Sequence, residues 1–187
     1  MPQARNSAAV QVVDYDPDWC RTFQTLKEHV WPSVCDVSIG IEHVGSTSVP
    51  GMAAKPVIDM DIVVATRSTV PLLILRLAEL GYQHRGNLGI QDRESFSAPD
   101  GKPAHHLYVC VQNSLALQNH IAFRDYLRKH PSDVLAYSEL KKQLAERFPN
   151  DRDQYVKRKT WFIVSLLKKC GLTRAREDLD SIRISNF

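Results

Sequence analysis

The sequence predicts an α/β (or α+β) fold in which a mixed β-sheet core is followed by a C-terminal layer of helices. Short apolar segments with the two-residue periodicity of strands alternate with helical segments in the first part of the chain. Residues 113–170 then contain three consecutive helical patterns, and residues 171–187 are a charged tail. We expect a core over residues 1–112 with the helical part packed on it, as one compact unit of 187 residues.

Local signals define the first four elements. Residues 10–13 are expected to form a short strand. Pro17 opens a helix over residues 17–34, because the first helical turn tolerates a residue without an amide hydrogen. Residues 38–44 and 55–65 form the next two strands, since apolar residues recur in both at the period of an extended chain.

The remaining elements follow from caps and breakers. Ser68 or Thr69 caps a helix that Gly81 ends. The stretch 83–103 is rich in glycine and proline and is expected to be a loop, with a strand near residues 94–97. The last expected elements are a strand over residues 105–111 and helices over residues 114–129, 132–148 and 152–170.

Two carboxylates alternate with apolar residues in the strand over residues 55–65. Residues two apart in a strand point to the same face, so Asp59 and Asp61 share one face while their apolar neighbours fill a core. Like charges at neighbouring positions repel each other, and a divalent cation keeps both groups ionised. We therefore predict that Asp59 and Asp61 hold Mg²⁺, with Mn²⁺ as the alternative.

A Gly-Ser turn precedes this strand. Gly45 and Ser46 offer backbone amides and a hydroxyl that can approach an anion closely. Each half alone has an ordinary explanation, because such turns often only end a strand and Asp-x-Asp is often a solvated turn. Together, with twelve residues between Ser46 and Asp59, they are typical of a site for nucleotidyl transfer.

Composition limits the class of protein. The sequence is 43% hydrophobic and 24% charged, as in ordinary soluble domains. We find no apolar run long enough for a membrane span and no apolar region of a signal peptide at the N-terminus, and four scattered cysteines read as reduced thiols. We therefore expect a cytoplasmic protein without a membrane partner.

The two halves of the chain differ in charge. Residues 1–100 carry 8 Lys/Arg against 12 Asp/Glu, and residues 101–187 carry 16 against 9. An acidic half that holds metal and a basic half suit an enzyme that handles polyphosphates, although a solvated helical surface can show the same asymmetry. A nucleic-acid partner stays open but unsupported, because we find no basic-aromatic patch of a known binding module.

Several longer blocks occur in a fixed order along the chain. They are DYDPDW from Asp14, HVGSTSVPGMAAKPVIDMDI from His43, DRESF from Asp92, HHLYVC from His105, NHIAFRDYLRKHP from Asn119, AYSELKKQLA from Ala136 and DRDQYVKRKTWFI from Asp151. With these blocks the chain resembles the GrpB family of nucleotidyltransferase-fold proteins over roughly residues 10–167. The resemblance implies a nucleotidyltransferase-like mixed sheet. It also implies a relation to the C-terminal domain of some dephospho-CoA kinases, where related domains look auxiliary.

Nucleotidyltransferases usually supply a third carboxylate from a strand beside the Asp-x-Asp strand. The expected strand over residues 105–111 contains none and presents His106, Tyr108 and Cys110 on one face. We prefer Glu94, on the segment entering that strand, because a hard cation prefers carboxylate oxygen to imidazole nitrogen. His106 is the alternative, as a metal ligand or a phosphate donor. Ordinary roles are a surface charge for Glu94 and a hydrogen-bonded, half-buried histidine for His106.

Basic side chains of the helical part are candidates for binding phosphates. Lys141 and Lys159 lie on the apolar stripes of their helices, where a lysine either extends its amine to water or aims it into a cleft that holds an anion. Arg124 suits bidentate binding of phosphate, or it pairs with an acid of the core such as Asp61 or Glu94.

We therefore predict a Mg²⁺-dependent nucleotidyltransferase that moves a nucleoside monophosphate from a nucleoside triphosphate to an unknown acceptor. The alternative is a catalytically inactive module that binds a nucleotide or a CoA precursor and acts through a partner protein. The predicted site residues are Asp59, Asp61 and Glu94 for catalysis, Asp59, Asp61 and His106 for metal, and Gly45, Ser46, Arg124, Lys141 and Lys159 for the nucleotide.

Overall fold

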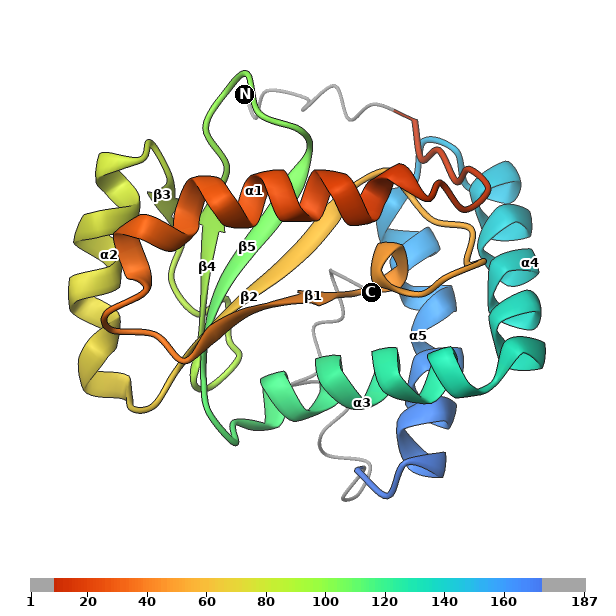
Figure 1. The fold of residues 1–187 in the computed structure, drawn as a ribbon. Coiled ribbons are helices and arrows are strands. Elements are labelled where there is room, and N and C mark those ends of the chain that lie inside the picture. Colours follow the sequence, from red (N-terminus) through yellow and green to blue (C-terminus); the bar gives the residue numbers. More distant parts are fainter. Residues whose placement is uncertain (1–8, 173–187) are drawn as a thin grey trace, which may run out of the picture.

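The computed structural model describes residues 9–172, which form a five-stranded sheet with helices on both faces (Figure 1). The strands are β1 (Gly40–Val44), β2 (Ile58–Val64), β3 (Gln83–His84), β4 (Arg93–Ser97) and β5 (His105–Val111). The helices are α1 (Asp18–Val34), α2 (Val70–Glu79), α3 (Leu115–Lys129), α4 (Pro131–Arg147) and α5 (Arg152–Lys169), with short 3₁₀ helices η1 (Ser46–Ser48) and η2 (Arg67–Thr69). The strand order is β1-β2-β5-β4-β3, in which β2 and β5 are parallel and the other neighbours antiparallel.

The two faces of the sheet have different covers. Helices α1 and α2 lie on one face, where apolar residues such as Met60 and Leu107 join the main core. The other face carries Asp59 and Asp61 and is covered by α3, whose Leu117 packs against it. Helices α4 and α5 pack against α3 and against each other, beyond the end of the sheet at which β2 and β5 begin (Figure 1). The face that carries Asp59 and Asp61 is thus turned toward helices α3, α4 and α5, which we call the basic layer.

Local sequence explains where these elements begin. All of β2 is buried, as expected for a central strand covered on both faces. The side chain of Ser114 accepts a hydrogen bond from the amide of Leu117 at the start of α3, at 3.3 Å. The Asp151 carboxylate does the same for the amide of Gln154 in α5, at 3.0 Å. These caps fix the start of α3, which brings His120 to the carboxylate face, and of α5, which brings Lys159 there.

The predicted fold class is confirmed, and β5 occupies the residues predicted for it. Two local predictions were wrong. Residues 10–13 form no strand, because only Val13 makes an isolated antiparallel bridge, to Ala54. Strand β3 lies inside the stretch that we expected to be a loop, since two residues are too few to show a periodicity.

The start of α2 also differs from the prediction. The helix follows η2 directly. Thr69, one of the two predicted caps, is at the N-cap position, but its side chain makes no capping hydrogen bond. Of the predicted tail, residues 173–187 lie outside the described residues. Across residues 9–172, no helix combines the length and the hydropathy that crossing a membrane requires.

Candidate functional site

The Gly-Ser turn joins β1 to η1 and lies directly against the first aspartate of β2. Gly45 has φ = 70°, in the left-handed region that favours glycine, and a side chain there would collide with the Asp59 carboxylate. The buried hydroxyl of Ser46 accepts a hydrogen bond from Nζ of Lys141 in α4, at 2.9 Å. Glycine is therefore needed for the turn to bring Ser46, Asp59 and Lys141 together.

A narrow pocket opens beside this turn, between the sheet and helices α4 and α5. We call it the lysine pocket, because three lysines contribute to its wall. Its polar lining is Ser46, Thr47, Lys55, Asp59, His106, Lys141, Tyr155 and Lys159. Five of the predicted site residues thus meet in one place, although they lie far apart in the sequence.

The lysines of the helical layer are buried at unusual cost. Lys141 is 2% exposed and Lys159 is 1% exposed. Burial lowers the pKa of Lys141 well below its ordinary value, and the neighbouring charges of Lys159 and Lys55 lower it further, while Asp59 opposes them. Burial likewise lowers the pKa of Lys159 to about 7. Buried cations are stabilised by a paired anion, so this pocket is suited to a ligand with phosphate groups.

Asp59 is the carboxylate of the lysine pocket. It lies opposite His106 in the parallel pair of β2 and β5, and Nδ1 of His106 donates a hydrogen bond to its Oδ1 at 2.8 Å. The side chains are 11% and 33% exposed, respectively. His106 thus contacts a predicted metal ligand directly, and one carboxylate oxygen of Asp59 is not committed to it.

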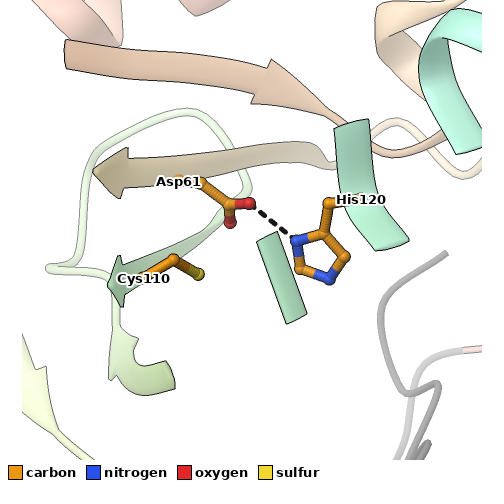
Figure 2. A group of neighbouring side chains, drawn as sticks. All are labelled: Asp61, Cys110 and His120. Atoms are coloured by element: carbon orange, nitrogen blue, oxygen red, sulfur yellow. Dashed lines mark hydrogen bonds and ion pairs between the residues drawn. The ribbon is translucent and has the colours of Figure 1, made fainter. Parts of the chain in front are cut away.

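Asp61 shares the face of Asp59 but has different surroundings. It is fully buried, and its Oδ2 accepts a hydrogen bond from Nδ1 of His120 in α3, at 2.7 Å (Figure 2). The Cys110 thiol lies beside it, and burial raises the pKa of that thiol, with the Asp61 carboxylate as the next cause. Asp61 does not line the lysine pocket. The two predicted metal ligands therefore lie in separate environments, one open and one closed by α3.

Glu94 lies on the opposite face of the sheet, so the placement that we expected for it was wrong. It pairs with Val109 of β5, which belongs to the main core, and not with the residues of the Asp61 face. Its carboxylate accepts a hydrogen bond from His84 at 2.8 Å and pairs with Arg67 at 3.4 Å. A shift of one residue along a strand changes the face, and sequence alone left this register open.

Arg124 is also placed away from the lysine pocket. Its guanidinium binds Glu42 at 2.6 Å and Asp125 at 2.8 Å, and not the expected Asp61 or Glu94. It lines a second pocket of about 620 Å³ between β1, α3 and the end of α5. Its charge is balanced by these two acids.

Two residues that contact the predicted site were not among our candidates. Lys55 lines the lysine pocket and has a pKa lowered mainly by burial. His120 holds Asp61 from α3. Lys55 lies four residues before Asp59 in the same sequence block. For His120, the only indication in the sequence was its position four residues before Arg124, on the same face of a helix.

Sequence relatives cover most of this chain. It is 38% identical over 154 residues to the UPF0157 protein YqkA of Bacillus subtilis, covering 82% of this chain and 45% of that protein. It is 31% identical over 169 residues to the glutamate-rich protein GrpB of Alkalihalophilus pseudofirmus, covering 88% and 97%. It is 26% identical over 182 residues to a dephospho-CoA kinase of Mycolicibacterium paratuberculosis, covering 83% and 44%. The chain therefore spans less than half the length of the first and third of these relatives.

Solved structures show the same fold. Conserved protein GrpB from Enterococcus faecalis has a TM-score of 0.76 at 33% identity, covering 86% of this chain and 99% of that one. The Cid1 poly(U) polymerase with MgGTP bound has a TM-score of 0.53 at 12% identity, covering 73% and 45%. The GLD-2/RNP-8 complex has a TM-score of 0.53 at 16% identity, covering 83% and 61%. The last two likenesses establish a nucleotidyltransferase-like fold and nothing further.

The family is shown directly by the length of the match. The family described as GrpB protein matches residues 9–169, which include the Gly-Ser turn, the Asp-x-Asp strand and all three helices of the basic layer. The blocks that carried the resemblance all lie within or overlap this range. This chain belongs to the GrpB family.

Proposed function

We propose that this chain is a divalent-metal-dependent nucleotidyltransferase that transfers a nucleoside monophosphate from a nucleoside triphosphate to an acceptor. The observation that carries the proposal is the lysine pocket, which places Asp59 and the Ser46 hydroxyl among three lysines on a nucleotidyltransferase-like fold. Such a pocket suits a chain of phosphates whose negative charges need cations on one side and a bridging metal on the other.

The residues present fit a magnesium ion. Mg²⁺ is commonly bound through one or two carboxylates together with substrate phosphates, and here Asp59 faces the pocket with Asp61 on the same strand face. When bound, the ion would supply charge that stabilises the leaving diphosphate. Asp61 would contribute only if Oδ2 is released from His120.

The protein's own groups would do the rest. Lys141, Lys159 and Lys55 would bind the β- and γ-phosphates, with Ser46 as a further hydrogen-bond donor. His106 would orient Asp59 through the hydrogen bond between its Nδ1 and Oδ1. An acceptor oxygen would then attack the α-phosphorus, and diphosphate would leave toward the lysines.

A second candidate is favoured by the closed position of Asp61. With Glu94 on the other face and Asp61 sealed by His120, Asp59 is the only carboxylate in the lysine pocket among the described residues. A module that binds a nucleotide or a CoA precursor without catalysis would need only the lysines and Ser46. The relation to a dephospho-CoA kinase, of which this chain spans 44%, is consistent with an accessory role.

Release of diphosphate distinguishes the two candidates. The purified chain is incubated with each nucleoside triphosphate, Mg²⁺ and a pool of acceptors from a cell extract. Transferase activity predicts diphosphate release that Lys159→Met abolishes and Lys157→Met, an exposed lysine on the same helix, leaves intact. Tight nucleotide binding that responds to the same variants without any release would support the accessory module instead.

A further inference from the structure

Three buried side chains that serve as ligands of transition metals meet outside the lysine pocket. Asp61 of β2, Cys110 of β5 and His120 of α3 each offer a ligand atom, and these atoms lie within 4.8 Å of one another. Figure 2 shows the Cys110 and His120 side chains on either side of the Asp61 carboxylate. None of the three lines the lysine pocket. We call this group the Asp-Cys-His cluster.

One oxygen of this cluster is left unsatisfied. Oδ2 of Asp61 accepts the hydrogen bond from His120. Apart from the neighbouring Cys110 thiol, whose weak interaction with the Asp61 carboxylate helps to raise the thiol pKa, the buried Oδ1 has no hydrogen-bond partner among residues 9–172. A buried carboxylate oxygen without a partner costs free energy, which a ligand at this point would recover. The unsatisfied atom is thus a second, independent sign of a binding site.

The donor atoms select the kind of ion. Mg²⁺ takes oxygen ligands, whereas a set of one sulfur, one imidazole nitrogen and one carboxylate oxygen suits Zn²⁺ and similar ions. We propose that the Asp-Cys-His cluster binds a divalent transition-metal ion of the zinc class. Nδ1 of His120 and Oδ2 of Asp61 are 2.7 Å apart, so they must separate slightly to share an ion with ligand distances of about 2.0–2.3 Å.

The charges around the cluster favour the thiolate form of Cys110 as a ligand of a bound cation. Arg93 of β4 lies opposite Cys110, and its buried guanidinium stacks on the Tyr108 ring at 4.6 Å. This positive charge opposes a cation bound by Asp61 alone. Two anionic ligands, the carboxylate and the Cys110 thiolate, balance the two positive charges of the ion, so that only the charge of Arg93 is left over. On binding, the thiol proton leaves to solvent, and His120 coordinates as a neutral imidazole whose Nδ1 hydrogen has moved to Nε2 or left to solvent.

The proposal goes beyond nucleotidyl transfer and does not depend on it. The ion would tie α3 to β2 and β5 and would hold Asp61 beneath the helix, whether or not the lysine pocket is catalytic. Metal binding is measured directly on the nucleotide-free protein. Failure to find diphosphate release would therefore leave this proposal standing, and failure to bind metal would leave the lysine pocket untouched.

Cobalt(II) is the probe for this site, because it binds zinc sites and has an absorption band when a thiolate coordinates it. The full chain, with the exposed Cys20 and Cys35 replaced by serine, is titrated with Co²⁺ and then with Zn²⁺. We expect one equivalent of Co²⁺ to give a thiolate-to-cobalt charge-transfer band that one equivalent of Zn²⁺ removes. Absence of stoichiometric binding, or binding without this band, would overturn the proposal.

Two variants and a control locate the ion. Cys110→Ala should remove the band, while Cys170→Ala, a partly buried thiol elsewhere, should keep it. His120→Asn can still donate a hydrogen bond to Asp61 but lacks the imidazole, and it should weaken binding by about tenfold or more. If Cys110→Ala does not fold, His120→Asn decides, and unchanged metal affinity in that variant would refute the site.

Discussion

Two aspartate-histidine pairs lie on the same face of the sheet, and their aspartates are two residues apart on β2. The two pairs have different surroundings. Asp59 pairs with His106 at 2.8 Å and Asp61 with His120 at 2.7 Å, so the local chemistry is nearly the same. The first pair lines the lysine pocket and its histidine is 33% exposed, whereas in the second pair the side chains are 7% and 0% exposed.

The difference comes from the helices that cover each position. Asp59 lies where the strand meets the Gly-Ser turn and the buried lysines of α4 and α5. Asp61 lies where α3 crosses the sheet. The helix supplies His120, which binds Asp61, and it also covers Asp61 from solvent. The sequence motif Asp-x-Asp therefore does not by itself make two equivalent ligands, and we propose that the nucleotide and its magnesium ion bind at the open pair.

The largest expected effect concerns the buried lysines of the open site. Replacing Lys141 and Lys159 together by methionine keeps the shape but removes two charged donors. Each hydrogen bond to a charged group is worth about 1.5–3 kcal/mol, so polyphosphate affinity should fall by a hundredfold or more. Calorimetric titration with tripolyphosphate measures this loss. Unchanged affinity would show that the pocket is structural.

The second effect is a pH dependence of anion binding. The pKa of Lys159 is about 7 in the ligand-free protein, and a bound anion would raise it. Below pH 7 the lysine is already protonated, but above pH 7 binding must take up a proton, so affinity should fall with rising pH by up to about tenfold per unit. Titrations in buffers of different ionisation enthalpy measure this proton uptake. Its absence at pH 8 would contradict the assignment.

The same shift has an opposite consequence for folding. The ordinary pKa of a lysine, 10.5, applies to the unfolded chain. Between pH 7 and that value the unfolded state binds more protons than the folded state, so the contribution of Lys159 to the free energy of unfolding rises with pH. Stability and anion affinity should therefore change in opposite directions across this window.

A smaller effect is expected at the turn. Ser46→Ala removes the acceptor of the hydrogen bond from Lys141 and a donor to phosphate, which should weaken nucleotide binding by about 1–2 kcal/mol. Ser165→Ala, which removes a hydroxyl that only donates to its own helix, is the matched control. Equal affinities in the two variants would mean that the Gly-Ser turn does not touch the ligand.

The smallest effect is expected on the far face of the sheet. Glu94→Gln should leave nucleotide affinity and any diphosphate release unchanged, because the Glu94 carboxylate pairs with Arg67 and His84 on the face away from the lysine pocket. A loss of turnover by orders of magnitude, measured in the same assay, would show that Glu94 reaches the reacting groups after all.

The sequence was sufficient for the fold class, because strand and helix periodicities are local. It also placed Lys141 and Lys159 on apolar stripes, where an amine either extends to water or turns into a cleft, but only the structure shows that both are buried beside Asp59. The sequence did not predict the register between β4 and β5. Whether Glu94 shares a face with Asp61 depends on how β4 pairs with β5, and no local signal fixes that alignment.

Long-range partners were equally out of reach. Arg124 could pair with any of several acids, and the choice of Glu42 follows from where α3 crosses β1. His120 had only its spacing on the helix to distinguish it. Asp61 is buried because α3 lies over it, and the Asp-x-Asp motif gives no information about where α3 packs.

The most direct test compares the two aspartates in one assay. Binding of a non-hydrolysable nucleoside triphosphate analogue is measured with and without Mg²⁺ for the parent chain, Asp59→Asn and Asp61→Asn. If the open pair is the functional one, Asp59→Asn abolishes the gain in affinity that Mg²⁺ gives, and Asp61→Asn reduces it much less. Retention of the Mg²⁺-dependent gain in Asp59→Asn, or its complete loss in Asp61→Asn alone, would contradict the account.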